Sequence, residues 1–270
     1  MVRYRVEIED AHAHLFRVTM QLPRPQPDQV VQLPVWIPGS YLVREFSRHL
    51  SGLAARQGRR DCAIEALDKS RWRVRCNGTA TLELSYRVYA FDRSVRAAFL
   101  DADRGYFNGS SLFLRAEGRE AQPHVLTLGR LPAGWQVATA MRPGPGRRQW
   151  QSADYAELID HPFEMGRFWR GQFQAGGVAH EIVVTGAWPS LDGERLLQDA
   201  RRVCEQHQRF WHARSHSAAP FGRYLFLVLA VEDGYGGLEH RDSASLVVAR
   251  RDLPRRGMAG QPDGYVTLLG

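Results

Sequence analysis

The sequence contains few cysteines and no long apolar run, and both absences limit its class. Three cysteines in 270 residues are too few and too scattered for a disulfide framework, and none forms a Cys-x-x-Cys metal pair. We therefore expect Cys62, Cys76 and Cys204 to be buried thiols. The longest apolar stretch, residues 224–231, is far shorter than the roughly 18 to 20 residues of a membrane span, so no membrane partner is expected.

The N-terminus also lacks the apolar core of a cleaved export signal. Residues 1–5 lead directly into an alternating strand pattern, which makes the cytoplasm the expected location. A composition of 44% apolar and 24% charged residues is typical of globular proteins and excludes wholesale disorder. At 270 residues the chain is longer than one average domain, which favours two folded units or one large sheet protein.

Lysine is almost absent, although the chain has a net charge of +7. Lys69 is the only lysine among 36 basic residues, so the basic character comes from arginine. Arginine clusters such as those at 147–148 and 250–256 lack the regular aromatic residues typical of nucleic-acid binding. A basic patch alone supplies only non-specific attraction to phosphates, so we do not expect a nucleic-acid partner.

Residues 2 to about 140 alternate between apolar and polar side chains. Tyr4, Val6 and Ile8 alternate with charged residues, and residues 82–88 repeat the pattern, as expected for half-buried strands. Pro, Gly and Asn clusters separate further short runs, which predicts an antiparallel β domain. Because strand patterns continue beyond the Pro-Gly cluster at 141–147, we expect that cluster to be a long turn rather than a linker.

A change of period predicts a helix of about five turns that begins near Asp192. Its apolar face repeats at helical spacing and ends with His207, Phe210 and Trp211. We expect His207 to be a satisfied core histidine and the two aromatic residues to belong to the core.

A glycine-dense loop follows residues 224–230, which are apolar on both sides and predict a central buried strand. In this loop Gly236 and Gly237 allow another backbone to approach, and an exposed strand edge there would hold an extended peptide. Glu239 is then placed to pair with a free α-amine. The alternative is a turn whose glycines adopt positive φ and whose glutamate is only solvated.

Known catalytic motifs are incomplete or absent. His180-Glu181 begins a His-Glu-x-x-His zinc motif, but the fifth residue is wrong and the β-branched surroundings predict a strand. Phosphate loops, nucleophile elbows and dinucleotide fingerprints do not occur. The residues alone therefore reveal no complete catalytic centre.

Three segments in order along the chain carry a family resemblance. Residues 236–243, Gly-Gly-Leu-Glu-His-Arg-Asp-Ser, resemble the Gly-Gly-x-Glu-His-x-x-Ser signature of the glycyl aminopeptidase family of zinc metallopeptidases. Residues 33–49 resemble the hallmark of its N-terminal domain, and 157–166 resemble its Asp-x-Pro-x-Glu-x-Gly stretch. The resemblance implies a mainly β plus α+β fold. It implies an N-terminal antiparallel β-sandwich-like domain over 1–166 and the first, incomplete part of a thermolysin-like catalytic domain over 167–270.

The resemblance also implies what the chain lacks. In that family the Gly-Gly-x-Glu-His loop precedes a His-Glu-x-x-His zinc helix, and residues 263–270 resemble the entry to that helix. We therefore expect no metal ligands and no catalytic residues within this chain, which alone should neither bind zinc nor hydrolyse peptides. Zinc would be the cofactor of a longer protein, and members of the family commonly also carry a C-terminal PDZ domain.

By similarity to the related aminopeptidase N group, several residues acquire expected roles. Glu239 would bind the α-ammonium of a substrate, and the backbone of Gly236 and Gly237 would hold the peptide near the scissile carbonyl. His240 stands where that group has asparagine, which leaves its role open. Glu164 is expected either to be a second carboxylate facing the amine or to be a capping or surface residue.

The sequence thus predicts the N-terminal portion of a zinc-dependent aminopeptidase that removes N-terminal Gly or Ala from peptides. Its partners would be peptides with a free N-terminus, and the sequence does not indicate an oligomeric state. The alternative function is a non-catalytic peptide-binding or scaffold module that uses the same glycine-lined edge.

Overall fold

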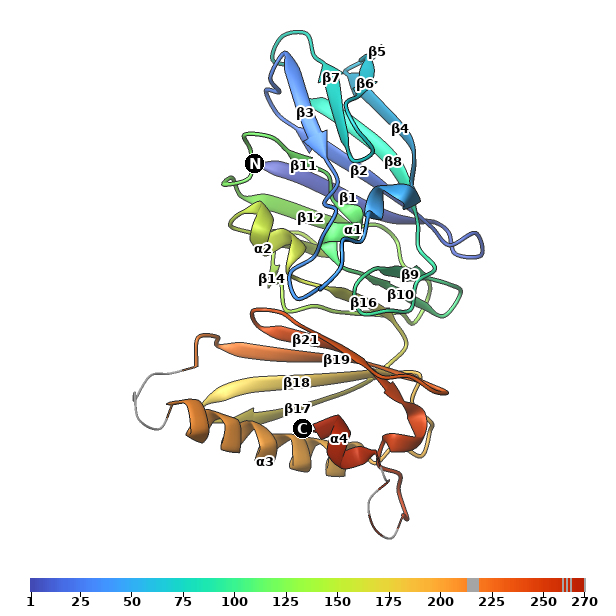
Figure 1. The fold of residues 1–270 in the computed structure, drawn as a ribbon, viewed down its shortest axis with the longest axis vertical. Coiled ribbons are helices and arrows are strands. Elements are labelled where there is room, and N and C mark those ends of the chain that lie inside the picture. The colour runs from blue at the N-terminus through green and yellow to red at the C-terminus, as the bar shows by residue number, and fades with distance from the viewer. Residues whose placement is uncertain (213–218, 259, 261, 263, 270) are drawn as a thin grey trace. The chain divides into compact units, whose positions relative to one another are not determined.

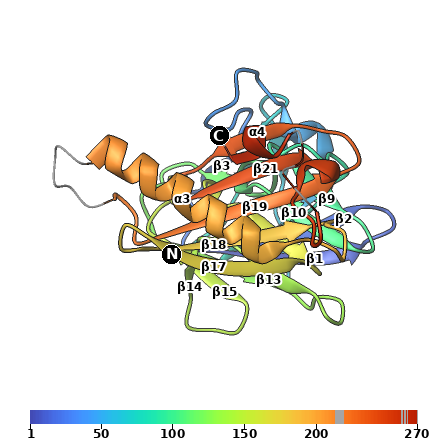
Figure 2. The ribbon, with the colours of Figure 1, turned by 90° about the horizontal axis from the view of Figure 1, so that it is seen from below.

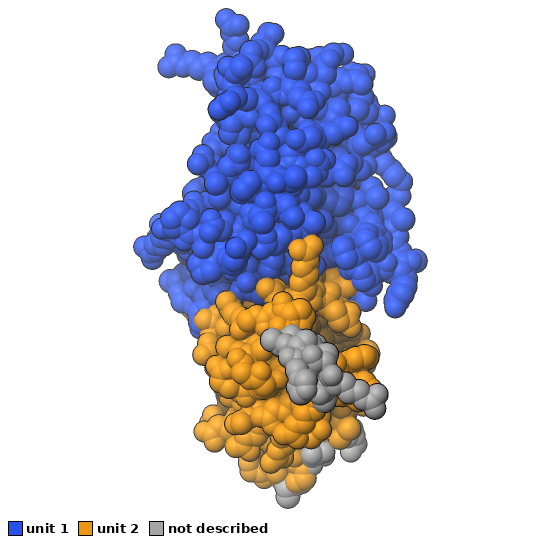
Figure 3. All heavy atoms as spheres, turned by 90° about the vertical axis from the view of Figure 1, so that its left-hand side faces the viewer, with its two compact units in different colours: residues 1–165 blue, residues 166–270 orange. Residues whose placement is uncertain are grey.

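The computed structural model describes residues 1–212, 219–258, 260, 262 and 264–269. The chain divides into two compact units, residues Met1–Met165 and Gly166–Gly270, which Figure 3 shows in different colours. We call them unit 1 and unit 2 and describe each by itself. No helix in the described residues is long and apolar enough to cross a membrane.

The largest sheet of unit 1 has eight strands. In spatial order they are β14 (Arg142–Pro143), β15 (Gln149–Ser152), β12 (His124–Leu128), β1 (Val2–Asp10), β2 (Leu15–Leu22), β8 (Leu82–Tyr89), β4 (Leu50–Gln57) and β5 (Arg60–Asp61). Buried and exposed residues alternate along β1 and β8, as the sequence predicts. Neighbours pair antiparallel, except that β1 runs parallel to β12, with Val2 opposite His124. The Pro-Gly cluster forms the β14–β15 hairpin and is a turn, as predicted.

Two four-stranded sheets complete unit 1. One contains β13 (Gln136–Ala138), β16 (Phe163–Gly166), β10 (Arg104–Phe107) and β9 (Ala98–Leu100). The other contains β11 (Arg115–Ala116), β3 (Asp28–Gln32), β7 (Arg71–Arg75) and β6 (Ile64–Ala66). Short helices lie between strands: η1 (Phe46–His49), α1 (Gly109–Leu112) and α2 (Tyr155–Ile159).

The core of unit 1 buries large aromatic side chains whose polar atoms are paired. Tyr4 donates to the Leu114 carbonyl at 2.7 Å, and Tyr86 donates to the Leu112 carbonyl at 2.6 Å. Each bond satisfies a hydroxyl that burial would otherwise leave without a partner. The predicted mainly β fold is confirmed in this unit.

Unit 2 contains a five-stranded sheet. Its spatial order is β17 (Trp169–Ala175), β18 (Val178–Thr185), β19 (Arg223–Val231), β21 (Ser243–Ala249) and β20 (Gly236–Glu239). β19 lies in the centre, parallel to β18 and β21, which confirms the predicted buried strand. His180 and Glu181 lie in β18, so the truncated zinc motif belongs to a strand, as predicted.

Helix α3 (Gly193–His212) lies across one face of this sheet, as Figures 1 and 2 show. Asp192 precedes its first turn and accepts a hydrogen bond from the Arg195 amide at 3.1 Å, as expected of a helix cap. Residues such as Leu196 and Ala200 pack on the sheet. The short helix η2 (Arg250–Asp252) follows β21, and α4 (Tyr265–Leu269) is the last element described.

The end of α3 differs from the prediction. Phe210 and Trp211 are 77% and 71% exposed, so their assignment to the core is wrong. The last turn of the helix extends past the ends of the strands, where no sheet lies beneath it (Figure 1). Apolar spacing identified the correct helix face, but the length of the sheet decides where burial ends.

Candidate functional site

The glycine-dense segment forms β20, which is the last strand of its sheet in the described part of the chain. It pairs antiparallel with β21, with Gly236 opposite Val247 and Glu239 opposite Ala244. The His240 amide donates to the Ser243 carbonyl at 2.8 Å. Because main-chain bonds alternate along antiparallel strands, Glu239 directs its main-chain groups away from β21 and toward the edge of the sheet.

The two glycines of β20 do not have the left-handed conformation of a tight turn. Neither Gly236 nor Gly237 has a positive φ, so the alternative prediction of a positive-φ glycine turn is wrong. A Cβ added at Gly236 would meet nothing within 4 Å, and one at Gly237 would meet only the Leu246 side chain at 3.4 Å. Packing does not require glycine at 236. The missing side chains instead leave this edge open to the approach of another backbone.

Glu239 lines a cavity of about 310 Å³ within unit 2. Cys204 and His207 of α3, Tyr224 of β19 and Leu268 of α4 also line it. Glu239 is exposed and forms no hydrogen bond or ion pair with the residues that the structure describes. Its carboxylate is therefore available to a ligand.

The cavity has one acidic side chain in an apolar surround. Burial raises the pKa of Tyr224 to about 12, and the nearby Glu239 carboxylate and Cys204 add to this shift. Burial also raises the pKa of the Cys204 thiol to about 11. Both groups are therefore neutral near pH 7, and Glu239 is the only acidic residue among the described lining residues. This charge distribution favours a cationic group next to apolar atoms.

Two lining residues were not recognised from the sequence. His207 was expected to be a satisfied core histidine, but it is exposed and lines the cavity, so that prediction is wrong. Tyr224 belongs to the apolar run of β19, and its hydroxyl donates to the Ser243 carbonyl at 3.2 Å. The parallel pairing of β19 with β21 places Tyr224 beside the turn that follows Glu239, and no local pattern reveals this pairing.

His240 lies in the turn between β20 and β21. Its side chain is partly buried, and its amide closes the turn by donating to Ser243. The structure thus gives its backbone a role in ending β20. A role for its side chain toward a ligand stays a prediction.

Glu164 has a different environment from the one expected. It lies in β16 of unit 1, is 3% exposed, and accepts hydrogen bonds from Nε and Nη2 of Arg104, each at 2.8 Å. Arg104 lies in the neighbouring β10 and stacks over Phe99 and Tyr106. The expectation of a capping or surface residue is therefore wrong, because Glu164 belongs to a buried ion pair. Its role as a second carboxylate facing a substrate amine stays a prediction.

The described residues do not fit a zinc centre. No group of three or more His, Cys, Asp or Glu side chains among them is arranged to hold a metal ion. We accordingly assign no metal ligand within the described part of the chain.

Comparison with solved structures places this fold among the aminopeptidases and related metallopeptidases. The chain is similar to an aminopeptidase N family protein from Idiomarina loihiensis, with 35% identity, a TM-score of 0.94 and coverage of 99% of this chain and 46% of that one. A Deinococcus radiodurans M1 zinc metallopeptidase bound to a Tyr-Ser-Ala substrate shares the fold at 12% identity and a TM-score of 0.50. The match covers 90% of this chain and 58% of that one. Yeast LTA4 hydrolase also shares the fold, at 11% identity and a TM-score of 0.50. The match covers 91% of this chain and 40% of the hydrolase.

Residues 3–167 match the model of the Peptidase M61 N-terminal domain, which is more than half of the chain. The chain belongs to this peptidase family. It spans less than half the length of the Idiomarina protein. No curated protein matches the chain.

Proposed function

We propose that the chain is the N-terminal part of a zinc-dependent aminopeptidase and that β20 holds its peptide substrate. An extended peptide would lie along the open edge of β20, where main-chain groups supply affinity without regard to sequence. Glu239 would bind the α-ammonium at the end of that peptide.

The proposal rests on the unpaired carboxylate of Glu239. Its carboxylate has no partner among the described residues, lines an apolar cavity and ends an edge strand. A lone carboxylate in such a place complements the one positive group that every peptide with a free N-terminus carries. Membership of a peptidase family supports the same assignment.

The preference for N-terminal Gly or Ala, the zinc cofactor and the cytoplasmic location are finer parts of this proposal. The preference rests on the resemblance of residues 236–243 to the glycyl aminopeptidase signature. The zinc ligands would lie outside the described residues, since these provide no ligand set. We also propose that nucleic acid and membranes are not partners.

Peptide binding tests the role of Glu239. We expect Gly-Gly-Gly and Ala-Gly-Gly to bind, and their N-acetylated forms to bind about tenfold more weakly because they lack the ammonium charge. Isothermal titration calorimetry measures both affinities. Glu239→Gln should reduce the affinity for the free peptides to that for the acetylated ones. Equal binding of free and acetylated peptides by the unaltered chain would exclude this role.

Glu194→Gln is the matched control for that experiment. Glu194 is an exposed glutamate of the same unit in the first turn of α3, about 15 Å along the helix from Cys204. Removing its charge should leave peptide affinity unchanged. A similar loss in both variants would indicate a general charge effect rather than a site at Glu239.

The coding sequence beyond Gly270 separates the enzyme from a non-catalytic peptide-binding or scaffold module. If it encodes a His-Glu-x-x-His helix, the extended chain should release N-terminal Gly or Ala from peptides and lose this activity to a chelator. An extended chain that binds zinc and peptide but cleaves none would support the module instead.

A further inference from the structure

The strand register of unit 1 places Cys62 opposite Cys76, although the sequence predicts only scattered, buried thiols. β6 and β7 pair antiparallel, with Ile64 opposite Val74 and Glu65 opposite Arg73. The same register places Cys62 opposite Cys76, just beyond the end of β6. The Arg75 amide donates to the Ala63 carbonyl at 2.9 Å, so the pairing continues in this direction.

Continued by one step past the Arg75–Ala63 bond, the register makes the two cysteines a non-hydrogen-bonded pair. Their amides bond elsewhere, since Cys62 donates to the Ala55 carbonyl at 2.8 Å and Cys76 donates to the Pro27 carbonyl at 2.7 Å. In such a pair the Cα atoms are about 4.5 Å apart and the side chains are at their closest. This separation is within the roughly 4.4 to 6.8 Å that disulfides span.

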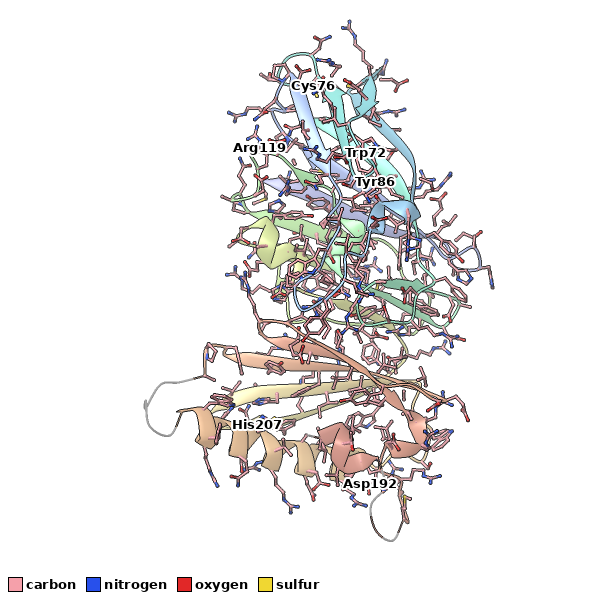
Figure 4. All side chains as sticks on the ribbon, in the orientation of Figure 1. Trp72, Cys76, Tyr86, Arg119, Asp192 and His207 are labelled. Carbon is pink, nitrogen blue, oxygen red and sulfur yellow. The ribbon has the colours of Figure 1, made fainter. Side chains whose placement is uncertain are left out.

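The surroundings of the two thiols support this geometry. Cys62 Sγ lies 3.8 Å from Oε1 of Gln57, and the same oxygen accepts a bond from the Asn77 amide, next to Cys76, at 2.7 Å. Burial raises the pKa of Cys76 to about 11, and the proximity of Cys62 adds to the shift. Figure 4 labels Cys76 at this end of β7.

The two thiols differ in access. Both are free in the structure; Cys62 is partly exposed, whereas Cys76 is 8% exposed. A small reagent therefore reaches Cys62 first, and Cys76 is placed to resolve whatever forms there.

We propose that Cys62 and Cys76 form a redox-active dithiol that closes to a disulfide by exchange with a low-molecular-weight disulfide such as oxidised glutathione. The Cys62 thiolate attacks one glutathione sulfur, forming a mixed disulfide and releasing one glutathione thiolate. The Cys76 thiolate then attacks Sγ of Cys62, which breaks the mixed disulfide and releases the second glutathione thiolate. The protein loses two electrons and two protons, and oxidised glutathione becomes two glutathione thiols.

The bond would connect two sheets of unit 1. Cys62 follows β5 of the eight-stranded sheet, and Cys76 follows β7 of a four-stranded sheet. Closure would therefore fix the short connection between β5 and β6 against β7.

Mass spectrometry of the chain after treatment with oxidised glutathione tests the proposal. The unaltered chain should lose two hydrogen atoms, retain no glutathione on Cys62 and yield a linked peptide pair containing Cys62 and Cys76. Dithiothreitol should reverse the change. Retention of glutathione on Cys62, no reaction at Cys62, or a bond to Cys204 would each overturn the proposal.

Three variants sharpen this test. Cys76→Ser should retain glutathione on Cys62, because no resolving thiol remains, and Cys204→Ser should behave as the unaltered chain. Cys62→Ser combined with Ala63→Cys moves the thiol to an exposed neighbour on the opposite face of the strand. This chain should retain glutathione on the new cysteine. Closure of a disulfide from that position would show that the register does not govern the reaction.

Discussion

Glu164 and Glu239 both lie in β-strands, and their surroundings give them opposite properties. β16 lies between β13 and β10, so Glu164 is buried and binds Arg104 with both oxygens. β20 ends its sheet, so Glu239 is exposed and has no partner among the described residues. The position of a strand within its sheet, rather than the residue type, thus decides whether a carboxylate stabilises the fold or remains available to a ligand.

Glu164→Ala tests this difference with the largest expected effect. It leaves the Arg104 guanidinium buried without its partner, so the free energy of unfolding of unit 1 should fall by about 3–5 kcal/mol. Urea unfolding measures the change. Replacing both Arg104 and Glu164 by Met should cost less than the single change, because no unpaired charge remains. A single-variant loss below about 1 kcal/mol would contradict the assignment.

His124 is a second buried ionisable residue of unit 1. It is 1% exposed, and burial lowers its pKa to about 4, although a hydrogen bond that the ring donates to the Gln122 backbone and the nearby Asp154 carboxylate both act in the opposite direction. Between about pH 4 and 6.5 the unfolded chain therefore binds more protons at His124 than the folded chain does. The contribution of neutral His124 to the free energy of unfolding is fully present above this window and is lost as the pH falls through it. The loss should approach roughly 3 kcal/mol. His124→Phe, which cannot titrate, should lack this part of the pH dependence in urea unfolding.

The two units also differ in how tightly they pack around a glycine. A Cβ at Gly109 of unit 1 would lie 2.7 Å from Cα of Ile159, whereas a Cβ at Gly236 would contact nothing. Gly109→Ala should therefore destabilise the chain by about 1–3 kcal/mol, and Gly236→Ala by less than about 1 kcal/mol. Thermal unfolding of the two variants measures this contrast. Equal losses would show that β20 is packed as tightly as the interior of unit 1.

The smallest effect is expected from Glu239→Gln on the chain without ligand. The free energy of unfolding should change by no more than about 0.5 kcal/mol, because an exposed, unpaired carboxylate is removed. The pKa of Tyr224 should fall from about 12, since the nearby negative charge is gone. NMR titration of the chain with isotope-labelled tyrosine measures the pKa of Tyr224 in both variants. An unchanged pKa of Tyr224 would place the carboxylate away from the cavity.

Local patterns were sufficient to predict many elements of the fold. Alternation identified β1 and β8, uniform apolarity identified β19, and Asp192 marked the start of α3. These features depend on neighbours within a few residues. The glycine-rich segment was recognised from composition, which left open whether it is an exposed strand edge or a tight turn; the structure shows the strand edge.

Long-range pairing explains what the sequence did not reveal. Arg104 and Glu164 are sixty residues apart and meet because β10 and β16 are neighbours. Cys62 and Cys76 meet through the register of β6 with β7. His207 and Phe210 share the apolar face of α3, yet the sheet beneath does not cover them. Such outcomes depend on which strands become neighbours and where they end.

The parallel pairing of β1 with β12 sets an order for assembly. β1 lies between β2, which follows it immediately, and β12, which begins more than one hundred residues later. During synthesis one side of β1 must therefore wait until His124–Leu128 have left the ribosome. Contacts this distant in sequence slow folding. β1 therefore completes its hydrogen bonds only after β12 has been made, so a chain that ends before β12 exposes one edge of β1 to chaperones or to aggregation.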